Sequence, residues 1–200
     1  MKNSMVKIKK ALISVSNKSG LKKFVSDLNS LDIKVIASGG TAKFIKDNGF
    51  NVIDIEKITG FPQLLGGRVK TLHPKIHSSI LADRDKQDHI KDLKKMEIDT
   101  IDLVVCDLYP FSDAVDKKKD IDYCVENIDI GGITLLRAAG KNFKYVTVIT
   151  NISQYQEVID HLKENKGYST YKFRLKKANQ AFESSSNYDF QILKWFNQLN

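Results

Sequence analysis

The feature that most restricts the fold of this chain is the alternation of short apolar runs with amphipathic segments near its N-terminus. Residues 11–15 form an apolar run that ends in a polar turn, and apolar residues at helical spacing follow. Residues 35–37 repeat the run before the turn Ser38-Gly39-Gly40-Thr41 and a second helical segment, and residues 52–53 begin a third strand. Strands that alternate with helices in this way predict an α/β fold with a parallel sheet, right-handed crossovers and a binding edge at the carboxyl ends of the strands.

Later segments continue the same pattern. Residues 101–106 and 146–149 are apolar runs typical of buried strands, and residues 153–163 predict an amphipathic helix with Asn151 as its N-cap. Residues 85–96 predict a charged surface helix whose inward side carries Ile90, Leu93 and Met96.

The C-terminal residues 169–199 are helical in character, and we expect an interruption at 184–187. So apolar a tail must pack on the domain, on a partner subunit, or on both. The sequence therefore predicts three layers, a mostly parallel sheet flanked by helices, with helices at the C-terminus.

Length and composition predict a single domain over residues 1–200. The 200 residues are 42% hydrophobic and 28% charged, which allows such a chain to bury about 70% of its unfolded surface without cross-links. Cys106 and Cys124 lack C-x-x-C spacing, and the N-terminus lacks the apolar run of a signal peptide. We therefore expect a cytoplasmic protein. No stretch approaches the roughly 18 consecutive apolar residues of a membrane span, so we expect no membrane partner.

The net charge of +8 does not by itself indicate a nucleic-acid partner. The lysines are spread along the chain, and the densest run, Lys117-Lys118-Lys119, lies between Asp116 and Asp120. We interpret that run as a solvated loop and not as a groove for a polyanion. Small anionic ligands remain the expected partners.

Residues 65–74 carry the first candidate site. Gly66 and Gly67 allow close approach of a ligand to the backbone, Arg68 offers a planar fork for oxyanions, and Lys70 adds a second cation. On an extended segment Arg68 and Lys70 would point the same way. This pattern indicates an anion site, and the alternative is a solvated basic loop.

The turn Ser38-Gly39-Gly40-Thr41 carries the second candidate site. At the start of a helix its backbone N–H groups and two hydroxyls suit a phosphate, and Lys18 in the neighbouring turn would project over the same edge. The alternative is an ordinary loop with Thr41 as the N-cap. The turn is neither a Walker motif nor a G-x-G-x-x-G fingerprint.

Two histidines suggest a zinc site only superficially. Pro74 disfavours a helix through His73, and no third ligand accompanies His73 and His77. We expect no metal here and expect His73 to form hydrogen bonds near the site.

A carboxylate and a tyrosine complete the candidate chemistry. Asp129 precedes the pair Gly131-Gly132 that opens a helix, where it could act as a cap or could accept a proton beside N–H groups that hold an oxyanion. Lys141 would lie roughly 12 Å along that helix. Tyr109 follows a strand end, on the binding edge or packed under the loop.

Together these motifs resemble the inosine monophosphate cyclohydrolase domain of the bifunctional purine biosynthesis protein family. The resemblance covers nearly the whole chain and rests on segments 14–20, 38–41, 60–62, 65–74, 107–111 and 127–142. It implies a methylglyoxal-synthase-like fold and the dehydrative ring closure of 5-formamidoimidazole-4-carboxamide ribotide to inosine monophosphate. It also implies a homodimer and no metal or organic cofactor.

The resemblance carries the family's roles onto matching positions of this sequence. It implies catalytic roles for Lys70, Tyr109, Asp129 and Lys141. It implies that substrate is bound by Ser14, Ser16, Lys18, Ser38, Gly40, Thr41, Arg68, Thr71, Ile130 and Gly131.

Some positions depart from the family pattern. Asp107 stands where an Asn is usual and adds negative charge near the binding edge, Gly140 replaces an Ala before Lys141, and Ser184-Ser185-Ser186 replaces an expected His-Thr pair. The family's formyltransferase domain is absent from these 200 residues, so we expect either a fragment or an activity that stands alone. A regulatory nucleotide-binding module, a methylglyoxal synthase and a nucleic-acid-binding protein are the competing hypotheses.

Overall fold

The core of the molecule is a parallel sheet. The structure, a computed structural model, describes residues 4–62, 64–69, 71–109, 111–116 and 120–199. Within these ranges the main sheet has five strands in the order β4-β3-β2-β5-β6, and every neighbouring pair is parallel. The strands are β2 (Lys10–Ser14), β3 (Lys34–Ala37), β4 (Ile53–Asp54), β5 (Leu103–Cys106) and β6 (Thr147–Ile149). The predicted α/β fold with a parallel sheet is confirmed.

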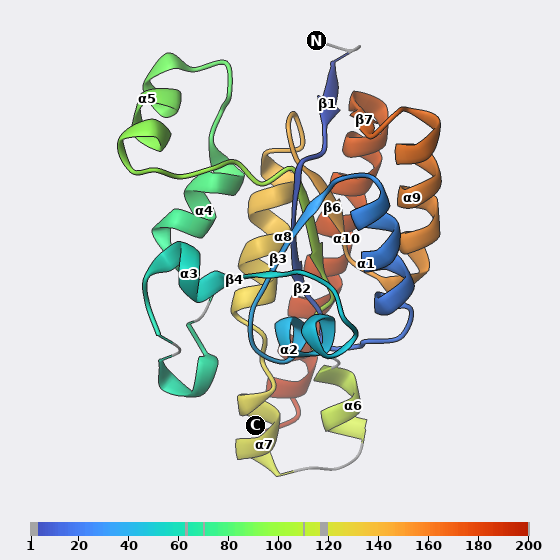
Figure 1. Ribbon diagram of the computed structural model, residues 1–200. Helices are drawn as coiled ribbons and strands as arrows, with labels where there is room; N and C mark the ends of the chain where they lie inside the picture. The colour runs from blue at the N-terminus through green and yellow to red at the C-terminus, as the bar shows by residue number, and fades with distance from the viewer. Residues whose placement is uncertain (1–3, 63, 70, 110, 117–119, 200) are drawn as a thin grey trace.

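Helices cover both faces of this sheet because successive strand side chains point to opposite sides. Ala11 and Ile13 of β2 pack with α1 (Leu21–Ser30), α2 (Gly39–Asp47) and α9 (Tyr155–Glu164), which form one core. Leu12 packs on the other face with α4 (Pro74–Leu81) and α8 (Gly131–Lys141). Figure 1 shows α1 and α9 on one side of the strands and α4 on the other, so the three predicted layers are present.

The connecting elements are short. They are α3 (Ile55–Thr59), the 3-10 turn η1 (Leu65–Gly67), α5 (Gln87–Lys95) and the 3-10 turn η2 (Ile152–Gln154). Asn151 was predicted to cap the helix over residues 153–163, but it caps η2 instead, where it accepts a 2.8 Å hydrogen bond from the Ser153 amide. Gln154 is the N-cap residue of the helix that follows, α9.

One inward position of the charged helix was predicted wrongly. Leu93 of α5 is buried and Ile90 is half-buried, but Met96 is 53% exposed. The helix ends at Lys95, so Met96 is its C-cap residue and leaves the helical periodicity that would have turned it inward.

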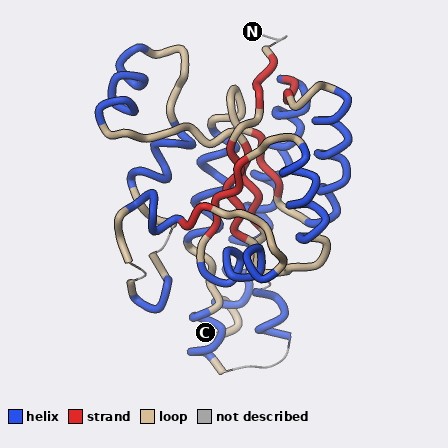
Figure 2. The backbone as a smooth tube through the Cα atoms, in the orientation of Figure 1, coloured by secondary structure: helices blue, strands red, loops and turns tan. Residues whose placement is uncertain are grey.

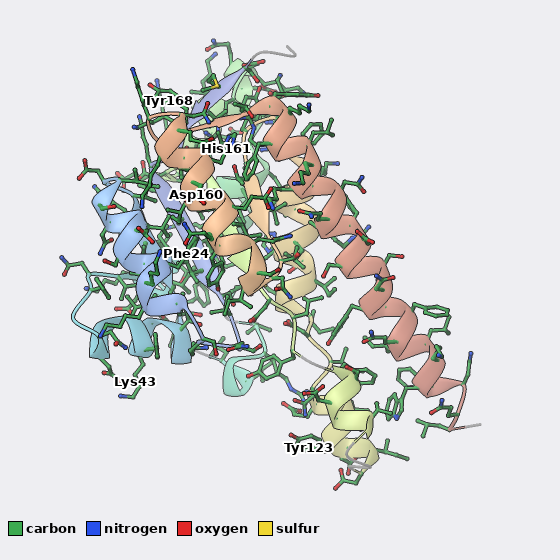
Figure 3. The ribbon with its side chains drawn as sticks, turned by 90° about the vertical axis from the view of Figure 1, so that its right-hand side faces the viewer. Phe24, Lys43, Tyr123, Asp160, His161 and Tyr168 are labelled. Atoms are coloured by element: carbon green, nitrogen blue, oxygen red, sulfur yellow. The ribbon has the colours of Figure 1, made fainter. Side chains whose placement is uncertain are left out.

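The C-terminal segment is one continuous helix, α10 (Tyr171–Phe196), so the interruption expected at 184–187 is wrong. Ser185 is buried and its hydroxyl donates 3.1 Å to the carbonyl of Phe182 one turn back, a geometry that lets serine stay within a helix. Figure 3 shows α10 running from the Tyr168 end of the molecule to the region of Tyr123.

A small antiparallel sheet joins the two parts of the chain that flank the main fold. It pairs β1 (Met5–Lys7) with β7 (Tyr168–Thr170), directly before α10. The guanidinium of Arg174 is fully buried beside it and donates hydrogen bonds to carbonyls of Ser4, Phe143, Lys144 and Ser169. Burial lowers the pKa of Arg174 to about 10.

A third cluster lies beyond the carboxyl ends of the strands. There α6 (Phe111–Asp116) and α7 (Ile121–Glu126) pack on the last turns of α10 through Phe111, Tyr188 and Trp195. Figure 2 shows these helices grouped below the strand ends. Through these contacts α6 and α7 hold the end of α10 next to the carboxyl edge of the sheet, which is where ligands of open parallel sheets bind.

Two expectations concern the surface of the molecule. No helix in the described ranges combines the length and apolar character of a membrane span. The run Lys117-Lys118-Lys119 lies outside the described residues, so its reading as a solvated loop stays a prediction.

Candidate active site

Thr41 joins two of the predicted binding turns. Its buried hydroxyl donates 3.0 Å to the carbonyl of Val15 and accepts from the Val15 amide at 3.3 Å. Thr41 therefore lies inside the first turn of α2, and the alternative that makes it the N-cap is wrong because Ser38 occupies that position. Gly39 has φ +52, a left-handed conformation that favours glycine at the point where β3 turns into α2.

Asp107 directly follows β5 and links the end of that strand to the turn after β2, at the same edge of the sheet. Ser14 and Cys106 are register partners, so β2 and β5 end side by side. The Asp107 carboxylate accepts hydrogen bonds from the amides of Ser16 and, at 3.0 Å, Asn17. The negative charge of Asp107, which stands where the family usually has Asn, is therefore stabilised by two backbone N–H groups of the turn between β2 and α1.

Lys18 lies over the same turn. Its ammonium donates to the carbonyls of Val15 and, at 3.2 Å, Ser16. The structure therefore brings together the turns that carry Ser14, Ser16, Lys18, Ser38, Gly40 and Thr41.

Asp129 folds back over the start of α8. Its Oδ1 accepts a 2.6 Å hydrogen bond from the Gly132 amide, which confirms the capping geometry. A Cβ on Gly132 would overlap the other carboxylate oxygen, so only glycine allows the carboxylate this position. Ile130 is the N-cap residue of α8 and is exposed.

Two further segments contact this helix start. The buried Thr71 hydroxyl would lie 2.6 Å from a Cβ on Gly131, and Leu108 would lie 3.0 Å from one on Gly132. Glycines at both positions therefore let segments 71–73 and 107–109 close on α8. Tyr109, next to Leu108, is 53% exposed, so the alternative of a tyrosine packed under the loop is wrong.

Arg68 is held away from the extended geometry we expected. Leu65–Gly67 forms a 3-10 turn and Arg68 itself is helical in backbone. Its guanidinium donates from Nε at 3.2 Å, and more closely from Nη2, to the carboxylate of Glu126 at the end of α7. The pair raises the pKa of Arg68 and lowers the pKa of Glu126. Lys70 lies outside the described residues.

Within one chain, the fold does not place Lys141 near Asp129. Lys141 is the last residue of α8, whereas Asp129 lies just before the first. In the sequence α8 lies between β5 and β6, and it runs antiparallel to these strands. The two ends of an 11-residue helix lie about 15 Å apart.

The histidines have structural partners. His73 caps α4, because its Nδ1 accepts from the Lys75 amide at 3.1 Å, which confirms its hydrogen-bonded role. Burial lowers the pKa of His77. Across the residues that the structure describes, no group of three or more His, Cys, Asp or Glu side chains is placed to hold a metal ion.

Comparison with known families decides the relationship of the chain. The family model of the MGS-like domain matches residues 20–134. This chain belongs to the MGS-like domain family. The model of the AICARFT/IMPCHase bienzyme matches residues 139–200, beyond the MGS-like part. The predicted fold and the predicted resemblance are both confirmed.

Individual relatives point the same way. The chain is 46% identical over 192 residues to the bifunctional purine biosynthesis protein PurH of Acetivibrio thermocellus, and 49% identical over 185 residues to that of Clostridium botulinum strain Langeland. These matches cover 96% and 92% of this chain but 37% of each relative. Among solved structures, the crystal structure of ForH superposes with a TM-score of 0.80 at 31% identity, covering 94% of this chain and 99% of that one.

Some contacts of the site carried no signal in the sequence. Tyr188 contacts Asp129 from 59 residues away, and only the packing of α10 brings them together. Glu126 directly precedes the segment 127–142, and its pairing with Arg68 depends on how α7 is placed. Asp107 was noted for its charge, whereas its two amide donors follow from the β2–β5 register.

Proposed function

We propose that this MGS-like domain closes 5-formamidoimidazole-4-carboxamide ribotide to inosine monophosphate with loss of water, the last step of purine biosynthesis. The observation that carries the proposal is the position of the Asp129 carboxylate at the start of α8, with Thr71 and Leu108 against the same two glycines. The similarity to PurH proteins and to the AICARFT/IMPCHase bienzyme supports it.

The reaction needs a weak nucleophile to attack a formyl carbon. The carboxamide nitrogen forms the new C–N bond, its proton passes to Asp129, and the formyl oxygen becomes a tetrahedral oxyanion. Backbone N–H groups near Ile130 and Gly131, with Lys70, stabilise that oxygen. The oxygen then takes up two protons from the proposed donors and leaves as water, while the former formamido nitrogen loses its hydrogen and forms the C=N bond of the new ring. That hydrogen and the proton taken by Asp129 replace the two that were donated.

The remaining site residues position the ribotide. Its phosphate and ribose bind at the strand ends, where α2 begins and where turn residues supply hydroxyl and ammonium groups. We assign this role to Ser14, Ser16, Lys18, Ser38, Gly40 and Thr41, and we place Arg68 and Thr71 among the substrate contacts at the reaction centre. Alignment of the two reacting groups supplies about 7 kcal/mol or more, and each oxyanion donor about 3 kcal/mol, so the mechanism requires no cofactor.

Tyr109 and Lys141 are the proposed proton donors to the departing oxygen. Tyr109 is exposed next to Leu108, which contacts the start of α8. Lys141 lies at the far end of α8, so a second copy of the chain has to supply it, in keeping with the expected homodimer.

We also propose that residues 1–200 form one cyclohydrolase domain. The chain spans 37% of the length of the PurH relatives, which are named as bifunctional proteins. The family's formyltransferase belongs to the remainder of such proteins.

Ultraviolet difference absorbance of the chain mixed with the formylated ribotide tests the function. We expect saturable conversion to a hypoxanthine spectrum, and we expect Asp129→Ala and Lys70→Ala to lower turnover by at least about tenfold. Asp99→Ala is the matched control, since Asp99 is exposed and pairs with Lys10 at the amino end of β2. Binding without conversion would indicate a regulatory nucleotide module, and wild-type rates in both site variants would disprove the mechanism.

A further inference from the structure

Tyr188 of α10 contacts the main chain of the proposed proton acceptor, Asp129, and of Asn127, two residues before it. Its phenol oxygen accepts a 2.8 Å hydrogen bond from the amide of Asp129 and donates at 3.3 Å to the carbonyl of Asn127. One hydroxyl therefore fixes both ends of the segment 127–129, from a helix far along the sequence.

The phenol is itself held in place. Tyr188 is 6% exposed, and its ring lies edge-on to Phe111 of α6, with centroids 6.3 Å apart. Burial raises the pKa of Tyr188 to about 12, so the hydroxyl keeps its proton and can both donate and accept at neutral pH.

Asp129 is thus held at two points by two different helices. Tyr188 of α10 binds its amide, while Gly132 of α8 binds Oδ1 of its carboxylate at 2.6 Å. A shift of the amide would move the carboxylate relative to the α8 amides, and a misplacement of about 1 Å at a reacting group can cost on the order of 100-fold in rate.

We propose that Tyr188 is a positioning residue that fixes the Asp129 carboxylate for ring closure, and that α10 is therefore part of the catalytic apparatus. This inference rests on the proposed function for its kinetic consequences. Its structural part, that Tyr188 holds segment 127–129 in place, does not depend on any enzymatic activity.

Tyr188→Phe is the test because it removes only the hydroxyl. Tyr145→Phe is the matched control: Tyr145 is 8% exposed, its hydroxyl donates 2.7 Å to Asp83 and accepts from the Asp85 amide, and it precedes β6 at the opposite end of the sheet. Both variants lose a buried phenol oxygen with two partners, so a general loss of stability affects both.

The first readout is amide hydrogen exchange of Asp129 and Gly132, measured by NMR. We expect protection at both amides in the wild-type chain, a loss of at least about tenfold in Tyr188→Phe, and no change in Tyr145→Phe. Wild-type exchange at Asp129 as fast as in exposed loops would overturn the proposal even if the variant failed to fold.

The second readout is kinetic. We expect Tyr188→Phe to lower kcat by at least about tenfold with KM changed less than about threefold, and to add nothing in an Asp129→Asn background. The acid limb of its pH–rate profile should move to higher pH, because a loosened Gly132 hydrogen bond stabilises the carboxylate less. Equal kinetics in Tyr188→Phe and Tyr145→Phe would overturn the proposal.

The two readouts separate the two proposals. A wild-type chain without turnover contradicts the function alone, since exchange still reports the hold on Asp129. Normal turnover in Tyr188→Phe contradicts the positioning role alone.

Discussion

Gly132 donates its amide to Oδ1 of Asp129 at 2.6 Å, and any side chain on Gly132 would occupy the place of the other carboxylate oxygen. The backbone of α8 and the Asp129 carboxylate are therefore packed so closely that no side-chain atom of residue 132 fits between them. The absence of a Cβ at residue 132 is a condition for the proposed chemistry.

Gly132→Ala should displace the carboxylate and lower turnover by at least about tenfold, because the added methyl cannot coexist with Asp129 in its present position. Gly49→Ala is the control, since Gly49 follows α2, has φ +82 and has open space around its Cβ position. It costs about 1–2 kcal/mol of backbone strain without touching the site. Steady-state kinetics of both variants separates lost stability from a distorted site, and equal turnover in both would contradict the prediction.

Asp107→Asn should increase the affinity for inosine monophosphate by about threefold at low salt, because it removes a negative charge beside the proposed phosphate turn. Calorimetry at low and high ionic strength measures this. The gain should shrink as salt screens the charge. Weaker binding in the variant would mean that the hold of Asp107 on the Ser16 and Asn17 amides matters more than its charge.

Lys141→Ala and Asp129→Ala should complement each other when the two inactive variants are mixed and allowed to exchange subunits. If each site combines Asp129 of one chain with Lys141 of another, random pairing restores about a quarter of the wild-type turnover. The activity of the mixture against time measures subunit exchange directly. A mixture as inactive as its components would contradict a site shared between two chains.

Asp102→Ala should destabilise the fold by about 3–5 kcal/mol, because it leaves buried partners without their acceptor. The Asp102 carboxylate accepts from the amides of Lys9 at 2.8 Å and Lys10 at 3.1 Å and from Arg84 at 2.7 Å. Asp99→Ala removes an exposed carboxylate that pairs with Lys10 and should change the free energy of unfolding by less than about 1 kcal/mol. Urea unfolding of both variants checks the difference.

His161→Asn should flatten the decrease of stability that occurs as pH falls below the unfolded pKa of 6.5. Burial lowers the pKa of His161, whose Nε2 accepts from the Thr170 amide at 3.2 Å and whose ring stacks 3.9 Å from that of Phe173. Because the folded pKa lies below the unfolded value of 6.5, the unfolded chain takes up the proton first as pH falls. Stability is therefore complete above 6.5 and decreases as pH falls through 6.5 toward the folded pKa.

Unfolding curves at several pH values measure that slope. His77, whose pKa burial also lowers, contributes in the same direction and remains in the variant. A slope unchanged by His161→Asn would show that His161 titrates alike in both states.

The strands of the sheet could be predicted because the sequence patterns that indicate them involve residues close together in the chain. The apolar runs at 11–15, 35–37 and 101–106 are recognised from residues close together in the sequence, and the structure has β2, β3 and β5 there. The error at Met96 came from extending a helical period beyond the residue where α5 stops.

The parts of the site that could not be predicted depend on packing across the chain. Arg68 meets Glu126 58 residues away, and Tyr188 meets Asp129 59 residues away. The sequence already predicted that Lys141 lies roughly 12 Å along the helix that follows Asp129. The direction of α8 relative to the strands, which places Lys141 at the far end, follows only from the sheet order.

The burial of Arg174 has a consequence for how the polypeptide is made. Its guanidinium binds the carbonyls of Ser4 and Ser169, so the first described strand and the start of α10 depend on one side chain. While a ribosome is still adding residues after 174, the five parallel strands exist without the helix that covers β6 and α8. Such long-range closure is slow, so the nascent chain should need protection from aggregation until α10 emerges.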